Sequence, residues 1–303
     1  MIETPILDVL RSLQVHGETH IIGGYLRDKL AGVKPKDVDM VTRIPFATLK
    51  ELIPNLHTTE QGEKLGVGRF QRHSYTFEIT SISHDIKSEL STKDFVLNTL
   101  AHDGENLIDF FGAQEQIEKR VISPQDIFLQ HTEHHPQAYL RAIRIASKIN
   151  ATLDPELLQV MKQQKNIFFS NHENRIRQEG YEILHSAYPQ VGVHILYELG
   201  LLYHAHPLER TPLSFDPQDV PYILAFLSLT SNRALAKNYV RLFKLKPALA
   251  DDALAIMKLD KAKKDTLPQR EFNKYIKWMR YRLQLEPEKL QAFFAELKER
   301  FSK

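Results

Sequence analysis

The sequence predicts an α+β protein in which a mixed sheet with flanking helices forms a head and the rest of the chain is helical. Strand-like segments with alternating apolar and polar residues occur in the first third of the chain, as in Ser74–Ser81. From Pro124 onward, apolar residues recur at helical spacing. The 303 residues suffice for two or three domains, and we expect a head over 1–123, a neck over 124–190, and a body and tail over 191–303.

The first predicted elements surround a pair of glycines. Apolar residues at helical spacing predict a helix over residues 5–15, followed by a strand over 19–24 and a short helix from Tyr25. Gly23 and Gly24 lack a Cβ atom, so the backbone of the turn between strand and helix can approach a bulky anion closely. Free N–H groups at a helix N-terminus bind phosphate, and this turn is therefore a candidate phosphate site.

Asp37 and Asp39 come next and are two residues apart on a predicted strand. Both side chains should therefore point to one face of the sheet, where they repel each other unless a cation lies between them. Mg²⁺ suits this pair because it needs few carboxylates and leaves room for phosphate oxygens. A phosphate cradle beside a metal-binding pair is typical of phosphoryl or nucleotidyl transfer.

The remaining head elements include a short helix over 47–52, a glycine-punctuated loop over 61–70 that runs into a strand, and the strand Ser74–Ser81. This strand alternates between an apolar face (Tyr75, Phe77, Ile79) and a polar face (Thr76, Glu78, Thr80). The polar face either turns toward the aspartate pair and delivers Glu78 as a third carboxylate, or faces solvent. Alternation alone leaves both possibilities open.

These motifs resemble a known family. Gly23-Gly24-Tyr-Leu-Arg27-Asp28, followed by Asp37-Val-Asp39, is similar to the Gly-Gly-x-Val-Arg-Asp and Asp-x-Asp signature of class II tRNA nucleotidyltransferases (CCA-adding enzymes) and bacterial poly(A) polymerases. The similarity extends from residue 20 to about 200.

The resemblance implies a polymerase-beta-like nucleotidyltransferase head. It implies Asp37 and Asp39 as catalytic Mg²⁺ ligands, and Gly23, Gly24 and Arg27 as the triphosphate cradle. Asp28 would orient Arg27. The family also has a Glu-Val-Thr-Thr-like strand, which favours Glu78 as a third catalytic carboxylate.

Thr92–Leu100 reads as a helix and resembles the family's Arg-Arg-Asp-Phe-Thr-Ile-Asn-Ala motif. The resemblance places Lys93 and Asp94 at the ribose of the incoming nucleotide and Asn98 among the nucleotide-binding residues. Lysine keeps the charge of the family's arginine but loses its bidentate fork. Leu107–Gly112 resembles the family's Ile-Asp-Pro-Phe-Gly turn, in which Asp109 could also simply cap its own backbone.

In the neck, Tyr139–Ile149 resembles the family's Leu-Arg-Ala-x-Arg-Phe-Ala helix. Arg141 and Arg144 on that helix either reach the nucleotide or form salt bridges with the head. Asp154 is a predicted N-cap with Pro155 at the first helical position.

The base-reading motif of the family is altered in this chain. The family has Glu-Asp-x-x-Arg just before the neck helix, whereas this chain has His134-His-Pro-Gln-Ala138. His135 stands for the Asp and remains a candidate nucleotide contact, but Ala138 stands for the Arg and offers no hydrogen bond. His131, His134 and His135 do not predict zinc, since their spacing is poor for a tetrahedral site.

Charge is unevenly distributed along the chain. Its net value is +2, yet residues 233–303 contain 18 Lys and Arg against 9 Asp and Glu. Arg270, Lys274 and Lys277 lie along one stripe of a predicted helix over 267–283, beside aromatic residues. A basic stripe of this kind suits an RNA backbone, although a solvated lysine-rich face is the alternative.

Composition sets outer limits on the interpretation. Hydrophobic content of 42% and charged content of 26% are ordinary for a soluble protein. No apolar run is long enough for a membrane span, and the Met1–Pro5 segment lacks the basic start of a signal peptide. The absence of cysteine excludes disulfide partners and fits a cytoplasmic location.

The sequence therefore predicts a template-independent, Mg²⁺-dependent nucleotidyltransferase. It would add nucleotides from NTPs, CTP or ATP, to an RNA 3′ end, most simply that of tRNA in CCA addition or part of it. A poly(A) polymerase-like enzyme of altered specificity and a non-catalytic RNA-binding relative are the alternatives. The intact aspartate pair argues against the non-catalytic reading, and the lost base reader argues against ordinary CCA addition.

Overall fold

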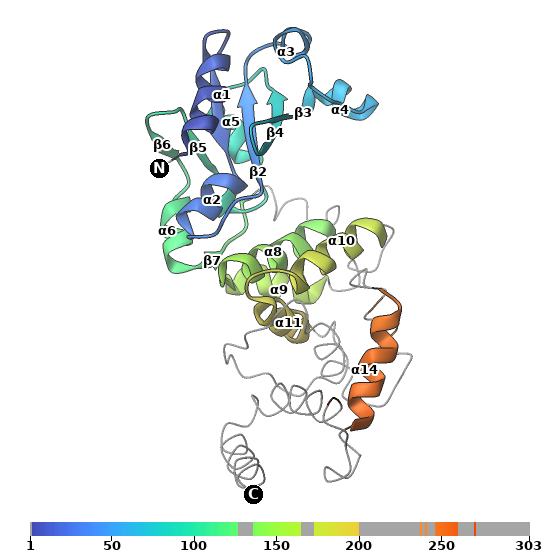
Figure 1. The fold of residues 1–303 in the computed structure, drawn as a ribbon. Coiled ribbons are helices and arrows are strands. Elements are labelled where there is room, and N and C mark those ends of the chain that lie inside the picture. The colour runs from blue at the N-terminus through green and yellow to red at the C-terminus, as the bar shows by residue number, and fades with distance from the viewer. Residues whose placement is uncertain are drawn as a thin grey trace, which may run out of the picture. The chain divides into compact units, whose positions relative to one another are not determined.

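The computed structural model describes residues 2–126, 136–164, 173–199, 246–259 and the single residues 237, 240 and 270 (Figure 1). The chain divides into two compact units, which are described separately. The first contains Met1–His134 and Thr152–Leu157, and the second contains His135–Ala151 and Leu158–Lys303. The side chain of His135, together with Lys274 and Lys277, lies outside the described residues.

The first unit is built on a six-stranded mixed sheet in the order β3-β4-β2-β1-β5-β6 (Figure 1). The strands are β1 (Thr19–Ile22), β2 (Asp37–Thr42), β3 (Val67–Arg72), β4 (Tyr75–Ser81), β5 (Leu100–His102) and β6 (Leu107–Asp109). β2 and β4 run parallel, and the other neighbours are antiparallel. A mixed sheet with surrounding helices is the predicted α+β class, which the structure confirms.

Short helices surround this sheet. They are α1 (Thr4–Gln14), α2 (Gly24–Leu30), α3 (Phe46–Leu52), α4 (Glu60–Leu65), α5 (Ile86–Ser91) and α6 (Ala113–Lys119). α5 covers part of one face, where buried Leu90 packs with Ile22, Val41 and Ala101. On the opposite face the alternating residues of β2 and β4 are buried, with Phe77 completely inaccessible. The predicted alternation of Ser74–Ser81 is thus confirmed.

The predicted helix over Thr92–Leu100 is wrong. Only one 3-10 turn forms, η1 (Val96–Asn98), and β5 begins at Leu100. The side chain of Asp94 accepts hydrogen bonds from the backbone N–H of Phe95 and from Nδ2 of Asn98. This side chain competes with helical backbone pairing, as aspartate often does.

The predicted loop over 61–70 also differs, because its first part is helical. Thr59 caps α4 by accepting a hydrogen bond from the N–H of Gly62. Gly66 ends the helix in the left-handed conformation, at φ 69°, a common helix stop that glycine adopts without a steric cost. Glycine here marks a helix end and not an extended loop.

Asp109 caps the backbone at the start of α6, which is one of the two roles expected of it. Its carboxylate accepts hydrogen bonds from the N–H groups of Phe111, Gly112, Ala113 and Gln114. It thereby satisfies the free donors that begin α6.

The described part of the second unit is helical. Its helices are α8 (Pro136–Ile149), most of α9 (Pro155–Gln163), α10 (Glu173–Leu184), α11 (Pro189–Glu198) and α14 (Ala248–Leu259). The apolar residues of α8, among them Leu140, Ile143 and Ala146, are buried, and α8 contacts both α10 and α11. A Cβ atom at Gly192 of α11 would lie only 2.3 Å from Oγ of Ser147, so glycine allows this close packing.

Two smaller observations complete the fold. Asp154 accepts a hydrogen bond from the N–H of Glu156, which confirms the predicted N-cap of α9. Thr152–Leu153 forms a short strand, β8, parallel to β7 (Val121–Ile122), and this local pairing interrupts the predicted helical pattern. No helix in the described ranges is both long and apolar enough to cross a bilayer.

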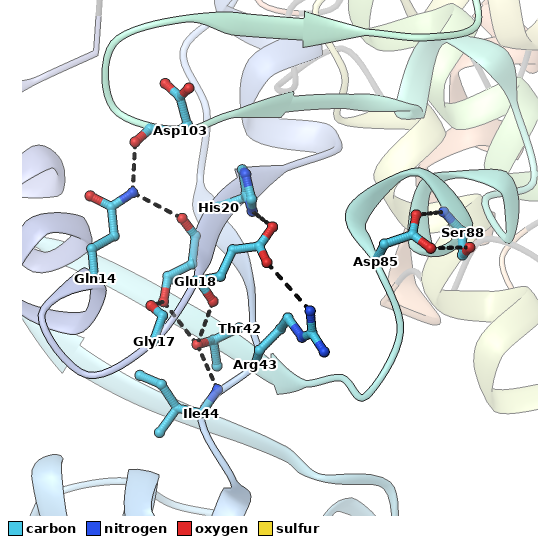
Figure 2. Close-up of polar contacts among 11 residues, drawn as sticks. Gln14, Gly17, Glu18, His20, Thr42, Arg43, Ile44, Asp85, Ser88 and Asp103 are labelled. Carbon is cyan, nitrogen blue, oxygen red and sulfur yellow. Dashed lines mark hydrogen bonds and ion pairs between the residues drawn. The ribbon is translucent and has the colours of Figure 1, made fainter.

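A buried polar network joins α1, β1 and β2 in the first unit (Figure 2). Oγ1 of Thr42 donates to the carbonyl of Glu18 at 3.0 Å, accepts from the N–H of Ile44 at 3.2 Å, and lies 2.8 Å from Oγ1 of Thr19. Nε2 of Gln14 donates to the carbonyls of Thr19 and Asp103. Thr42 is 1% exposed, so water cannot replace these partners.

We predict that Thr42→Val lowers the free energy of unfolding by about 1–3 kcal/mol, because the shape is kept while buried polar partners lose their hydrogen bonds. Urea titration measures the change. Thr152→Val, at an exposed position with one long hydrogen bond of 3.5 Å, is the control. Equal stability of the two variants would show that the network contributes little.

Candidate active site

One row of cross-strand partners organises the head. Arg69 pairs with Glu78, Glu78 with Asp39, and Asp39 with Ile22. The row continues through Ala101 to Ile108 on β5 and β6. Directly opposite residues share a face of the sheet. The β1, β5 and β6 half of this row is apolar and packs beneath α5, whereas the β2, β4 and β3 half is charged.

The two aspartates share this face, as predicted. β2 carries Asp37 and Asp39, and its parallel partner β4 places Thr76 and Glu78 directly opposite them. Alternation alone had left the direction of Glu78 open, and the register now sets it beside Asp39. Three carboxylates therefore occupy neighbouring positions on two adjacent strands.

The environment of Asp39 disfavours the ionised form of its carboxyl group. Burial raises the pKa of its carboxyl to about 6, and the negative charges of Glu78 and Asp37 add to this increase. Lys93 and Arg27 oppose it but do not cancel it. A carboxylate that resists ionisation because of buried like charges is a favourable position for a cation.

The glycine turn lies next to Asp39. Gly23 has φ 66° and ψ −126°, a backbone conformation that residues other than glycine rarely adopt. Oδ2 of Asp39 would be only 4.0 Å and 3.8 Å from Cβ atoms added at Gly23 and Gly24. α2 has seven residues, so its dipole is small and any phosphate cradle depends on the turn itself.

Arg27 lies beneath this turn and is 5% exposed. Its Nε and Nη2 donate to Oδ1 of Asp28 at 2.9 and 2.7 Å, and Nη1 donates to Oδ1 of Asn98 at 2.6 Å. Asn98 in turn donates to Asp94 at 3.0 Å. The predicted nucleotide-binding residues Arg27, Asp28, Asn98 and Asp94 thus form one hydrogen-bonded chain.

Lys93 reaches the same region from the end of α5. Its Nζ donates to Oε1 of Glu89 at 2.7 Å, while Oε2 of Glu89 lies 2.9 Å from Nε2 of His84. The positive charge of Lys93 also lowers the pKa of Asp39. The side chain of Glu89 is 12% exposed, so this carboxylate fixes the direction of Lys93.

The sequence reasoning missed Arg69 and Glu89. Arg69 donates from Nε to Oε2 of Glu78 at 2.6 Å, and its side chain is 72% exposed. Alternation within Val67–Arg72 shows only which residues share a face of that strand, and the pairing of β3 with β4 is needed to set Arg69 beside Glu78. Glu89 is four residues before Lys93, and that spacing predicts a helical ion pair.

Two carboxylates of this site, those of Asp37 and Asp39, are suited to bind a hard divalent cation. Within the described ranges, no three His, Cys, Asp or Glu side chains form a metal-binding group. One oxygen of Glu78 is engaged by Arg69, which leaves Asp37 and Asp39 as the available pair. Mg²⁺ commonly uses one or two carboxylates and completes its shell with phosphate oxygens and water, so the residues present fit Mg²⁺ together with a nucleotide.

The second unit contains the other predicted contacts. Nε of Arg144 donates to Oε2 of Glu179 at 2.5 Å, so this arginine pairs within its own unit. Arg141 is half-buried on the same helix, and Ala138 is 6% exposed. The nucleotide-binding roles of Arg141, Arg144 and His135 stay predictions, as does the RNA-binding role of Arg270.

Comparison with known proteins places this arrangement in a family. Residues 19–123 match the poly A polymerase head domain. The head of the chain belongs to the poly A polymerase head-domain family. The predicted resemblance to this family is confirmed over the head, and the relatives described next are nucleotidyltransferases.

Individual relatives are distant but extend beyond the head. The chain is 23% identical over 285 residues to a CCA-adding enzyme of Bacillus pumilus, covering 84% of this chain and 70% of that enzyme. It is 27% identical over 202 residues to a CC-adding tRNA nucleotidyltransferase of Halalkalibacterium halodurans, covering 64% of this chain but only 52% of that enzyme.

A solved structure shows the same fold. The CCA-adding enzyme of Bacillus stearothermophilus in complex with CTP has a TM-score of 0.72 and 20% identity, over 98% of this chain and 84% of that one. The likeness covers both units of this chain, whereas the family model covers the head alone.

We predict that Asp39→Asn raises the free energy of unfolding by up to about 3 kcal/mol at pH 7.5 in the presence of a chelator. The variant removes a carboxylate whose pKa is raised by about two units in the folded protein, and this shift corresponds to a destabilisation of that size when the group is ionised. The folded-state pKa is raised from 3.8 to about 6. The destabilisation by ionised Asp39 is therefore absent below pH 3.8 and complete above pH 6. The extra stability of Asp39→Asn over the wild-type protein should appear between these pH values.

Urea titrations of Asp39→Asn and the wild-type protein across this pH range measure the effect, with Glu105→Gln at an exposed turn as the control. Mg²⁺ should stabilise the wild-type protein and not the variant. Identical stability at every pH would contradict the assignment of unfavourable charge to Asp39.

Proposed function

We propose that the protein transfers nucleotides from NTPs to the 3′ end of an RNA, with tRNA as the acceptor. The observation that carries this proposal is the position of Asp39, an acidic group with an unfavourable charge directly beside the Gly23-Gly24 turn. A cation held there by Asp37 and Asp39 would supply positive charge for the reaction of the triphosphate. The names of the CCA-adding and CC-adding relatives support a tRNA acceptor.

The reaction joins the RNA 3′-oxygen to the α-phosphorus of the NTP, breaks the bond to the β-phosphate and releases pyrophosphate. Asp37 and Asp39 would hold Mg²⁺, which when bound activates the hydroxyl and neutralises the leaving group. Gly23 and Gly24 give the triphosphate close access to the backbone. Arg27, fixed by Asp28, adds positive charge beneath the turn and holds Asn98 in place.

Lys93 and Asp94 would position the ribose. Glu89 restrains Lys93 at 2.7 Å, and Asp94 is linked to Arg27 through Asn98. Both groups are therefore preorganised before substrate binds, which lowers the entropic cost of orientation in the transition state.

Nucleotide choice should differ from strict C-C-A addition. An aspartate and an arginine together can pair with the edge of cytosine or adenine, whereas this chain has His135 and the buried Ala138. A pocket without those polar groups discriminates mainly by shape and stacking, which is weaker. The CC-adding name of one relative supports the idea that the added nucleotides vary among related proteins.

One assay tests both the nucleotidyl transfer and the choice of nucleotide. Purified protein with Mg²⁺ and one labelled NTP at a time is incubated with tRNA ending before CCA, and with an unrelated RNA. We expect transfer to tRNA with relaxed nucleotide use, and a loss of at least about 100-fold in the Asp37→Ala, Asp39→Ala variant. The double variant should retain RNA binding.

Transfer at wild-type rate by the double variant would refute the metal assignment. Clean addition of C, C and A without use of GTP or UTP would show that other residues read the base. No transfer by the wild-type protein to any RNA would favour a non-catalytic RNA-binding protein.

We also propose that the basic stripe of Arg270, Lys274 and Lys277 contacts the RNA backbone without reading sequence. Changing all three to alanine should weaken binding equally for different RNAs. Each lost phosphate contact should reduce the slope of log affinity against log salt by about 0.7–0.9. An unchanged slope in a binding titration would show that the stripe is only a solvated face.

A further inference from the structure

Arg69 lies at the candidate active site and takes no part in the chemistry proposed above. It is an arginine on the same face as the carboxylates, and its side chain is 72% exposed. Only Nε is used in the ion pair with Glu78, at 2.6 Å. The negative charges of Glu78, Asp37 and Asp39 all raise its pKa, which places the guanidinium within their field.

The sheet order fixes the side of the carboxylates on which Arg69 lies. Gly23 follows β1, and Arg69 lies on β3, while β2 with Asp39 and β4 with Glu78 run between them. Neighbouring strands are about 4.8 Å apart. Arg69 and the glycine turn therefore flank the carboxylates from opposite sides.

This arrangement has a consequence for nucleotidyl transfer. In an in-line displacement, the attacking and leaving oxygens lie on opposite sides of the phosphorus. The leaving pyrophosphate belongs on the side of Gly23 and Gly24, so the attacking 3′-oxygen arrives from the other side. That is the side on which Arg69 is exposed.

We propose that Arg69 binds the last phosphodiester of the acceptor RNA and so positions the attacking 3′ end. This inference rests on the proposed function. A guanidinium offers several N–H donors in a fixed plane and forms paired hydrogen bonds with phosphate oxygens. The ion pair with Glu78 keeps the guanidinium on the carboxylate face, and its exposed part faces incoming substrate.

The same phosphate chemistry is present in the NTP, so the test separates the two sources. Acceptor RNAs are prepared with a normal or an uncharged methylphosphonate linkage at the last internucleotide position. Both are used with the wild-type protein and with Arg69→Gln, and kcat/KM for acceptor and acceptor affinity are measured. NTP affinity is titrated separately.

Arg72→Gln is the matched control. Arg72 lies on the same strand and is exposed, but it is three residues further on and therefore on the opposite face, with Phe70. It should behave like the wild-type protein with both acceptors.

We expect the uncharged linkage to reduce kcat/KM about 10- to 100-fold in the wild-type protein and to have almost no further effect in Arg69→Gln. NTP affinity should be unchanged. Equal losses from the uncharged linkage in both proteins would overturn the proposal and leave Arg69 as an orienting partner of Glu78. A loss of NTP affinity in Arg69→Gln would assign it to the triphosphate instead.

Acceptor affinity can be measured without turnover. The contact between Arg69 and the RNA is therefore tested separately from the proposed transfer reaction. Coupling between Arg69 and the linkage in binding, without any transfer by the wild-type protein, would count against the proposed function and not against the contact. Transfer by the wild-type protein without coupling would count against the contact alone.

Discussion

The parallel pairing of β2 with β4 sets Asp39 directly beside Glu78, and the site is arranged around the repulsion that results. Burial and two neighbouring carboxylates raise the pKa of Asp39 to about 6. Lys93 and Arg27 approach from one side and Arg69 from the other, yet the charge at Asp39 stays unfavourable. A protein retains such a cost where a ligand relieves it, and a divalent cation with a triphosphate is the ligand that suits these groups.

The supporting contacts explain how short elements hold this site. α2 has only seven residues, and η1 has three. Arg27 links them, because its guanidinium bonds Asp28 on α2 and Asn98 on η1. Threonines at the far end of β1 and β2 secure the same strands through buried hydrogen bonds (Figure 2). The glycine turn is thus held by hydrogen bonds between the elements on either side of it.

Local pattern predicted much of this from sequence, and its failures have physical causes. The period of two in Asp37–Asp39 and Ser74–Ser81 placed side chains on the correct faces. It could not say which strands are neighbours, so the direction of Glu78 and the presence of Arg69 needed the sheet order. The helix expected over Thr92–Leu100 failed because the N–H of Phe95 donates to the side chain of Asp94 and the N–H of Val96 donates to the carbonyl of Ser123. Glycines in 61–70 suggested a loop, whereas Gly66 ends a helix.

The central claim is that the charge of Asp39 is unfavourable until a cation arrives. NMR titration of its side-chain carboxyl carbon, with and without Mg²⁺, measures this directly. We predict a pKa of about 6 in a chelator and a much lower value with Mg²⁺ and a non-hydrolysable NTP analogue. An ordinary pKa near 3.8 that does not respond to Mg²⁺ would contradict this account.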